Sequence, residues 1–356
     1  MNKQEPREIF GRRLSQARRM RGMSLRAVAE ALGGLVSYNA LHRYEQGVMM
    51  PGDNVLLPIA DVLDKPLDFF FRPFTVELRE LGFRKTTGLG VKSEDAIKEQ
   101  ATDFFERYCE IEQILAVHSS FQDPLGDARY TSIDGAEEAA DRIRMSWKLG
   151  EDPLPNVIET LETNGFKVFE VEAPTSFNGF SGWADGHPVI VLAKWLNENI
   201  PRKRFTALHE AAHLLAAPHT DLTGKQMESF CDRFAGAMMI PSDVFKSDLG
   251  GFRHRISLEE LIDLKRRYGI SIAAIMYRAH DLKLIDDSTH RQFCIIRNKR
   301  GWHRNEPGEY KGTEVSSRFE QLVLRATAEE EISFDKGAAL LNVPLVEFQQ
   351  TLSEFL

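Results

Sequence analysis

One stretch decides how the centre of this sequence folds: His209-Glu210-Ala211-Ala212-His213. Four residues take slightly more than one helical turn, so both histidines would face the same side of a helix, about 5–6 Å apart. Two imidazoles at that spacing can share one zinc ion, at about 2.0–2.1 Å from each nitrogen. No glycine or proline occurs between Arg202 and Ala217. The stretch therefore predicts a helix that presents a Zn²⁺ site.

A catalytic zinc needs a third protein ligand and an open position for water. A second helix is predicted from Glu228 and ends at Pro241. Glu228 and Asp232 share one face of it, so Glu228 can bind the metal while Asp232 accepts the N–H of a ligating histidine. Glu210 would be the general base for hydrolysis. Two alternatives stay open: histidines on an apolar helix face without metal, and metal binding without catalysis.

The chain length and the cysteine count limit the class of protein. At 356 residues the chain exceeds one ordinary domain of about 100–200 residues, so two or three folded units are expected. Its three cysteines, Cys109, Cys231 and Cys294, form no C-x-x-C pair. This argues against a disulfide framework and against a cysteine-built zinc site. The start is polar and no apolar run approaches the roughly 18–20 residues of a membrane span, so a cytoplasmic protein without membrane contact is expected.

The charge of the chain is unevenly distributed. The net charge is -8, yet residues 1–72 carry eleven Lys or Arg against eight Asp or Glu. Seven of these cations fall between Arg7 and Arg26, where Glu8 is the one opposing charge. This cluster predicts a positive face near the N-terminus, with an ordinary solvated helix surface as the alternative.

The first 73 residues read as a bundle of short helices. Five are predicted, at 7–20, 24–32, 37–47, 54–63 and 67–71, from apolar spacing, serine N-caps and glycine ends. A linker follows at 86–91, and further helices are predicted at 94–117, 134–149, 156–163 and from 257 onward. Two apolar strands are predicted at 166–171 and 188–192. The fold class is therefore mainly α with a small β-sheet (α+β).

From about Gly135 to Pro241 the sequence resembles the ImmA/IrrE family of zinc metallopeptidases. The resemblance is carried by Pro188-Val-Ile-Val-Leu192, by Arg204-Phe-Thr before His209-Glu-Ala-Ala-His-Leu-Leu215, and by the helix from Glu228 to Pro241. It implies a zincin-like fold in which His209, His213 and Glu228 bind zinc, a gluzincin-like set, and Glu210 is catalytic. Family members more often have Gly than Ala212 and Ala than Cys231, but neither difference removes a ligand.

The same resemblance implies a substrate. Such enzymes cleave a specific regulator, typically a DNA-binding repressor, so a repressor-like or antitoxin-like protein is expected here. In such sites the strand before the motif helix commonly aligns an extended peptide by edge pairing. That task would fall to Val189, Ile190, Val191 and Leu192.

The first 72 residues resemble the Xre-type (lambda-repressor-like) helix-turn-helix, and their order with the peptidase matches a known fused architecture. The helix from Ser37 would enter the major groove of a double-stranded DNA operator. The candidates for base contacts are Ser37, Tyr38, Asn39 and His42, and those for phosphate contacts are Arg12, Arg13, Arg26 and Arg43. A homodimer is expected because such modules usually read paired half-sites. A helical protein–protein module is the alternative.

These interpretations divide the chain into four regions. They are a helix-turn-helix domain (1–73), a linker with a long helix (74–133), a peptidase domain (134–250) and a helical C-terminal region (251–356). The last is interpreted as helical support, with further helix-turn-helix units as the alternative. The leading hypothesis is a transcriptional regulator whose peptidase cleaves a partner, or itself, in response to a signal. The alternative is a transcription factor that cuts nothing and whose peptidase-like fold senses metal or a ligand.

Overall fold

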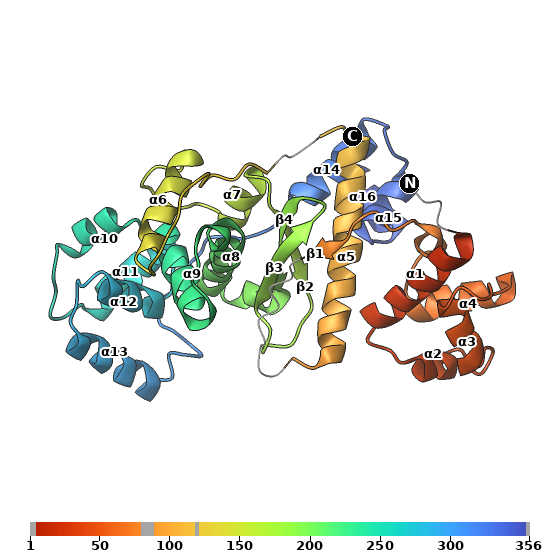
Figure 1. The fold of residues 1–356 in the computed structure, drawn as a ribbon, viewed down its shortest axis with the longest axis horizontal. Coiled ribbons are helices and arrows are strands. Elements are labelled where there is room, and N and C mark those ends of the chain that lie inside the picture. The colour runs from red at the N-terminus through yellow and green to blue at the C-terminus, as the bar shows by residue number, and fades with distance from the viewer. Residues whose placement is uncertain (1–4, 80–88, 118–120, 354–356) are drawn as a thin grey trace. The chain divides into compact units, whose positions relative to one another are not determined.

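The computed structural model describes residues 5–79, 89–117 and 121–353, and Figure 1 shows their arrangement. The chain divides into two compact units: the first contains residues 5–79, 89–117 and 318–353, and the second contains residues 121–317. The predicted fold class, mainly α with a small sheet, is confirmed. The predicted C-terminal region 251–356 is shared between the two units. Most of the predicted linker at 86–91 lies outside the described residues.

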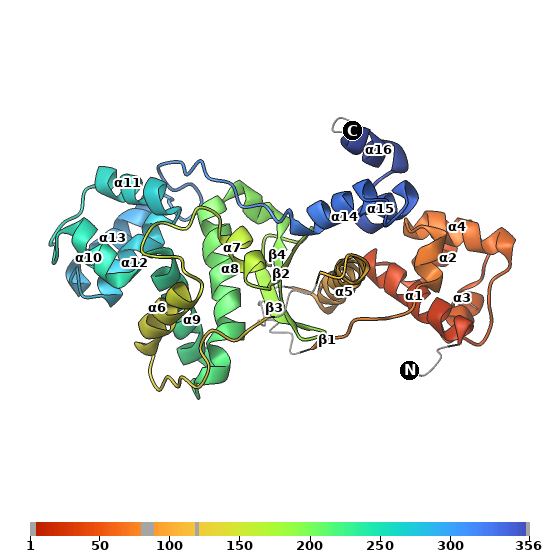
Figure 2. The same ribbon diagram turned by 90° about the horizontal axis from the view of Figure 1, so that it is seen from above.

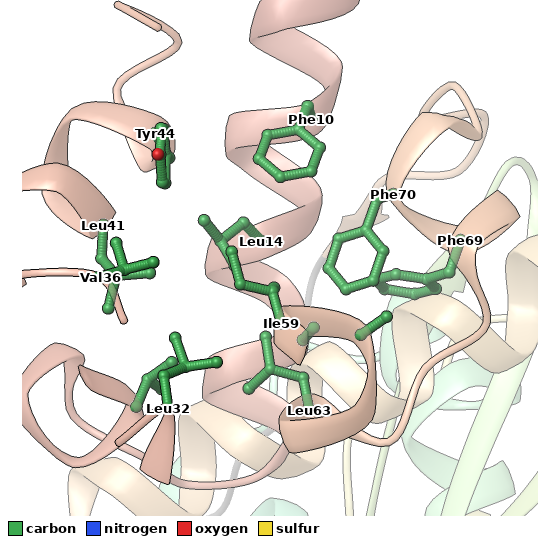
Figure 3. Close-up of a cluster of buried hydrophobic side chains, with 13 residues drawn as sticks. Phe10, Leu14, Leu32, Val36, Leu41, Tyr44, Ile59, Leu63, Phe69 and Phe70 are labelled. Atoms are coloured by element: carbon green, nitrogen blue, oxygen red, sulfur yellow. The ribbon is translucent and has the colours of Figure 1, made fainter. Parts of the chain in front are cut away.

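The N-terminal part of the first unit is a bundle of short helices. Its elements are α1 (Pro6–Met20), α2 (Leu25–Ala31), α3 (Tyr38–Glu45), α4 (Asp53–Leu63), the 3-10 helix η1 (Leu67–Phe71) and the short strand β1 (Leu78–Arg79). Figure 3 shows their core, in which Phe10, Leu14, Leu41, Ile59 and Phe70 are almost fully buried. The apolar spacing that predicted these helices therefore marks the residues of one shared core.

The rest of the first unit joins segments that are far apart in sequence. The long helix α5 (Val91–Ile114) packs against α14 (Arg318–Ala328), which is followed by α15 (Phe334–Leu341) and α16 (Leu345–Ser353). Tyr108 and Ile111 of α5 share a buried cluster with Phe319, Val323 and Phe348. The end of the chain thus supplies part of the core around α5.

A buried ion pair connects the helix bundle to α5. The Arg13 guanidinium is fully buried and donates to Glu106 Oε2 at 2.6 Å and to Gln16 Oε1 at 2.7 Å. It also donates to the backbone oxygens of Arg72 and Pro73 at 2.8 Å and 2.7 Å. The prediction that Arg13 contacts DNA phosphates is wrong, because these bonds fix its side chain inside the first unit.

Replacing Arg13 with alanine is expected to destabilise the first unit by about 3–5 kcal/mol, because the Glu106 carboxylate would remain buried without its main cation. Chemical denaturation followed by circular dichroism measures the loss. The exposed Arg43 offers a control, and Arg43→Ala should change stability by no more than about 0.5 kcal/mol. Equal stability of the two variants would contradict the structural role of Arg13.

The second unit combines a small sheet with ten α-helical or 3-10 segments. These are α6 (Gly135–Ser146), α7 (Val157–Thr163), β2 (Lys167–Val171), β3 (Gly179–Ala184), β4 (His187–Ala193), η2 (Lys194–Glu198), α8 (Ile200–Leu215), η3 (Ala217–His219), α9 (Gly224–Met239), α10 (Ser242–Leu249), α11 (Leu258–Tyr268), α12 (Ile272–Asp281) and α13 (Asp287–Lys299). Helix α8 packs on β3 and β4, and α9 packs on α8 (Figures 1 and 2).

Strand β4 lies between two partners. It pairs antiparallel with β3 and parallel with β2, with Ile190 opposite both Ser181 and Val168. The side chains from Val189 to Leu192 are fully buried. The prediction that these four residues align a peptide by edge pairing is wrong, because β4 is hydrogen bonded along both edges.

An extended segment after α13 contacts both α7 and α8 through Glu314. The Glu314 carboxylate accepts the backbone N–H groups of Val157, at 2.8 Å, and Ile158, at 2.9 Å, at the start of α7, and it pairs with Arg204 of α8. The ammonium group of Lys203 donates to the Glu314 backbone oxygen at 2.6 Å. A carboxylate is favourable at a helix N-terminus because it satisfies backbone donors there. This segment therefore fixes the helix that carries the two predicted histidine ligands.

Candidate metal centre and nucleic-acid interface

The predicted motif helix is α8, and it presents both histidines on one face. The ring centroids of His209 and His213 are 5.1 Å apart. His209 and Glu210 are almost completely buried, at 4% and 3% exposure. The i, i+4 spacing accounts for the shared face, and the packing of α8 on β3 and β4 accounts for the burial.

Glu228 on α9 faces both histidines. Its Oε2 lies 3.7 Å from His209 Nε2 and its Oε1 lies 3.6 Å from His213 Nε2. These separations exceed the range of about 2.7–3.2 Å for an N–H···O hydrogen bond. They are close to the spacing of about 3.3–3.4 Å between two ligands of a tetrahedral zinc with bonds of about 2.0–2.1 Å. The structure thus brings the three predicted ligands together at a spacing that fits a metal ion.

Asp232 lies on the other side of the His209 ring. Its Oδ1 is 2.7 Å from His209 Nδ1, which is a hydrogen-bond distance. A bond from Nδ1–H to a carboxylate fixes the imidazole tautomer and its orientation. His209 Nε2 is thereby directed toward Glu228, in the arrangement that the sequence predicted.

Cys231 is the neighbour that the sequence analysis missed. It is fully buried, and its Sγ lies 3.6 Å from His213 Nδ1. Ligand atoms of His209, His213 and Cys231 lie within 4.8 Å of one another, so a His-His-Cys donor set is also possible. Cys231, however, faces Nδ1 of His213, whereas Glu228 faces Nε2 of both histidines. The i, i+3, i+4 spacing of 228, 231 and 232 on one helix face could have revealed this contact.

Glu210 has a polar partner from the sheet. Ser181 Oγ of β3 donates to Glu210 Oε2 at 2.9 Å, and both side chains are buried. The sequence did not identify Ser181, because it lies in a glycine-rich stretch without a motif and meets Glu210 only through the packing of β3 on α8.

A cleft of about 1270 Å³ extends from the metal-site helices into the C-terminal part of the second unit. One wall comes from η2 and the start of α8, including Arg202 and Phe205, and the cleft also reaches Asp232 of α9. Further lining comes from α12 and from the segment 302–310. The lining of the cleft includes Asp232, whose carboxylate is hydrogen bonded to His209 Nδ1, but none of the three candidate metal ligands.

The predicted base-contacting residues lie at the start of α3. Ser37 is the N-cap, and its Oγ accepts the Ala40 N–H at 3.2 Å. Tyr38, Asn39 and His42 are exposed, and the rings of Tyr38 and His42 are nearly parallel with centroids 6.4 Å apart. The exposed side chains of this helix could reach the edges of bases in a groove.

Three of the four predicted phosphate-contacting arginines are exposed. Arg12 lies 4.0 Å above the Phe74 ring, Arg26 lies 5.9 Å from the Tyr38 ring centroid, and Arg43 is on α3. Within the described residues no carboxylate pairs with any of the three. They remain candidates for phosphate contacts, whereas Arg13 does not.

Two stretches of the chain match known families. Residues 14–70 match the helix-turn-helix family, and residues 162–280 match the IrrE N-terminal-like domain of the M78 peptidases. Searches of curated proteins and of solved structures found no match. None of the described helices is both long and apolar enough to cross a membrane. The chain thus joins a helix-turn-helix segment to an IrrE-like peptidase segment, as the sequence predicted, and the two matches support a DNA-binding regulator that carries a metallopeptidase-like domain.

Proposed function

We propose that this chain is a transcriptional regulator whose second unit is a zinc-dependent endopeptidase. Its substrate is a repressor-like or antitoxin-like protein, or the chain itself, and a signal controls the cleavage. The observation that carries the proposal is the approach of His209 Nε2 and His213 Nε2 to the two oxygens of Glu228, at 3.7 Å and 3.6 Å. Glu210 follows His209 directly in the sequence, and its carboxylate accepts a hydrogen bond from Ser181 of β3.

The donor set suits a catalytic metal. Two imidazoles and one carboxylate bind zinc in sites that keep a fourth position open. When bound, a zinc ion supplies Lewis acidity, which makes water a nucleophile near neutral pH and polarises a peptide carbonyl. Glu210 then accepts a proton from the attacking water and delivers it to the leaving amine. Ser181 holds the Glu210 carboxylate, and Asp232 holds His209.

A second candidate function follows from Cys231. Cys231 faces His213 Nδ1 and Glu228 faces Nε2, so both can bind one ion only if the His213 ring turns. With His209, His213, Glu228 and Cys231 all bound, the ion would have four protein ligands and no open position. Closed four-coordinate zinc sites are structural rather than catalytic. In that case the second unit would sense metal, and the chain would regulate transcription without cutting a protein.

New protein N-termini distinguish the two functions. A host cell extract is incubated with the zinc-loaded protein or with the same protein after chelation, and new N-termini are identified by mass spectrometry. We expect a few zinc-dependent cleavages, in DNA-binding proteins or in the chain itself. Identical N-termini in both samples would contradict the peptidase and favour the metal sensor.

For the first unit we propose that a homodimer binds an operator through α3. Arg43→Ala should weaken binding to all DNA sequences to a similar extent. The plot of log association constant against log salt concentration should also become less steep by about one, because one phosphate contact is lost. Titrations of labelled DNA at several salt concentrations measure this slope. Glu30→Gln on α2, an exposed substitution that removes a negative charge, serves as the control and should not reduce the slope. An unchanged slope for Arg43→Ala would contradict this contact.

A further inference from the structure

Three consecutive cations at the start of α8 have different environments. Lys203 and Arg204 are fully buried, and they pair with Glu170, at 2.7 Å, and with Glu314. Arg202 is exposed and lines the cleft. Within the described residues no carboxylate pairs with it. Of the three, Arg202 is therefore the cation that a ligand in the cleft can reach.

The Arg202 side chain is held in position by uncharged groups. It donates to Asn178 Oδ1 at 2.9 Å, and its guanidinium lies 4.8 Å from the Trp195 ring centroid. The Trp195 ring is itself fixed by a bond from its Nε1 to the Phe177 backbone oxygen at 2.7 Å. Partial burial lowers the pKa of Arg202, because the charged form loses water there. A guanidinium has five N–H donors, so this held group can still receive a carboxylate.

The other cations of the cleft are less suited to this role. Arg233 and Arg278 both pair with Glu137, at 3.1 Å and 2.9 Å, and Lys265 pairs with Glu306 at 3.1 Å. Arg233 also pairs with Asp134, so three carboxylates neutralise these three cations. Arg297 and Arg304 also line the cleft, but they come from the end of α13 and the segment after it. Arg202 instead lies on α8, the helix that carries His209 and His213.

The distance along α8 sets where a bound anion would lie. Arg202 precedes His209 by seven residues, which is close to two helical turns, so both point from the same face. Seven residues span about 10.5 Å along a helix. An extended chain covers about 3.3–3.6 Å per residue, so this span corresponds to about three substrate residues.

We propose that Arg202 is a specificity-determining residue, and that the substrates are polypeptides with an Asp or Glu side chain about three residues from the cleaved bond. This inference rests on the proposed peptidase function. The Arg202 guanidinium binds the substrate carboxylate in the cleft, held by Asn178 and Trp195, while the scissile bond lies at the His209–His213–Glu228 site.

The test is a cleavage profile of a peptide library, prepared by chymotryptic digestion of a denatured proteome so that the peptides keep internal acidic and basic residues. The zinc-loaded wild type, Arg202→Gln, Arg202→Glu, Glu210→Gln and Lys194→Gln are each incubated with the library, and the new termini are sequenced by mass spectrometry. Lys194 is the matched control, because it lies on η2 next to Trp195 but pairs with Glu172 and does not line the cleft. The best substrate is then synthesised with Glu or Gln at the selected position for measurement of kcat/KM.

We expect wild type and Lys194→Gln to select an acidic residue two to four positions from the cut. Arg202→Gln should lose this selection and lower kcat/KM for the Glu peptide about tenfold, mainly through KM, with little effect on the Gln peptide. Arg202→Glu should select Lys or Arg at the same position. If the wild type cleaved without selecting an acidic residue, or if Arg202→Gln kept the selection, the role of Arg202 would be contradicted while the proposed peptidase would stand. Wild-type cleavage no greater than that of Glu210→Gln would overturn the peptidase and this inference with it.

Discussion

Glu210→Gln is expected to lower the rate of peptide hydrolysis by at least about 10³-fold, within the range of about 10²–10⁴-fold that general acid–base catalysis provides. The amide cannot accept a proton from water at neutral pH. Its oxygen can still accept the hydrogen bond from Ser181, which now joins Ser181 Oγ to Glu210 Oε2 at 2.9 Å. The fold and the two flanking histidines are therefore expected to be unchanged.

The comparison needs equal metal content in both proteins. Zinc is quantified in the wild type and in Glu210→Gln, and the rates are measured on a substrate found in the N-terminal survey. Glu172→Gln is the control, because Glu172 is exposed and lies outside the site. A zinc-loaded Glu210→Gln that cleaves at the wild-type rate would show that another residue is the base.

The second large expected effect is the loss of zinc affinity when a metal ligand is replaced. His213→Ala and Glu228→Ala should each weaken zinc binding by more than about 100-fold, because the loss of a residue that only orients a ligand already costs about 10- to 100-fold. Asp232→Ala should fall within that smaller range, since Asp232 contacts His209 at Nδ1, at 2.7 Å, and orients that ligand from the side away from Glu228. Cys231→Ala should change the affinity less than tenfold. Competition with a chromophoric zinc chelator measures all four variants.

The order of these four affinities distinguishes the two donor sets. If Cys231→Ala released the metal while Glu228→Ala retained it, the site would be the His-His-Cys set and not the one proposed here. A His213→Ala variant with wild-type affinity would contradict both sets.

The sequence predicted those features that depend on local spacing. His209 and His213, like Glu228 and Asp232, are four residues apart, and a helix places such pairs on one face whatever surrounds it. The approach of the two helices was predicted from the need of a catalytic zinc for a third ligand, and the family resemblance implied the same pairing. The contact between Cys231 and His213 was missed because Cys231 was compared with the alanine of the family and not with the helix face that it shares with Glu228 and Asp232.

The errors concern features that depend on distant parts of the chain. Arg12 and Arg13 are adjacent and equally charged, but Arg13 is buried because Glu106 accepts its hydrogen bond from 93 residues away. The edge-pairing role of strand β4 came from the family resemblance, and the pairing of this strand with both β2 and β3 cannot be read from its own residues. The helices after residue 318 pack on α5 through contacts such as Tyr108 with Phe319, more than 200 residues apart.

The central claim is that the Nε2 atoms of two histidines and the Glu228 carboxylate hold one zinc ion and leave a position for water. X-ray absorption at the zinc edge of the metal-loaded wild-type protein tests it most directly, because sulfur ligands at about 2.3 Å are resolved from nitrogen and oxygen ligands at about 2.0–2.1 Å. The account predicts one zinc per chain with nitrogen and oxygen neighbours alone. A sulfur neighbour that disappears in Cys231→Ala would contradict it.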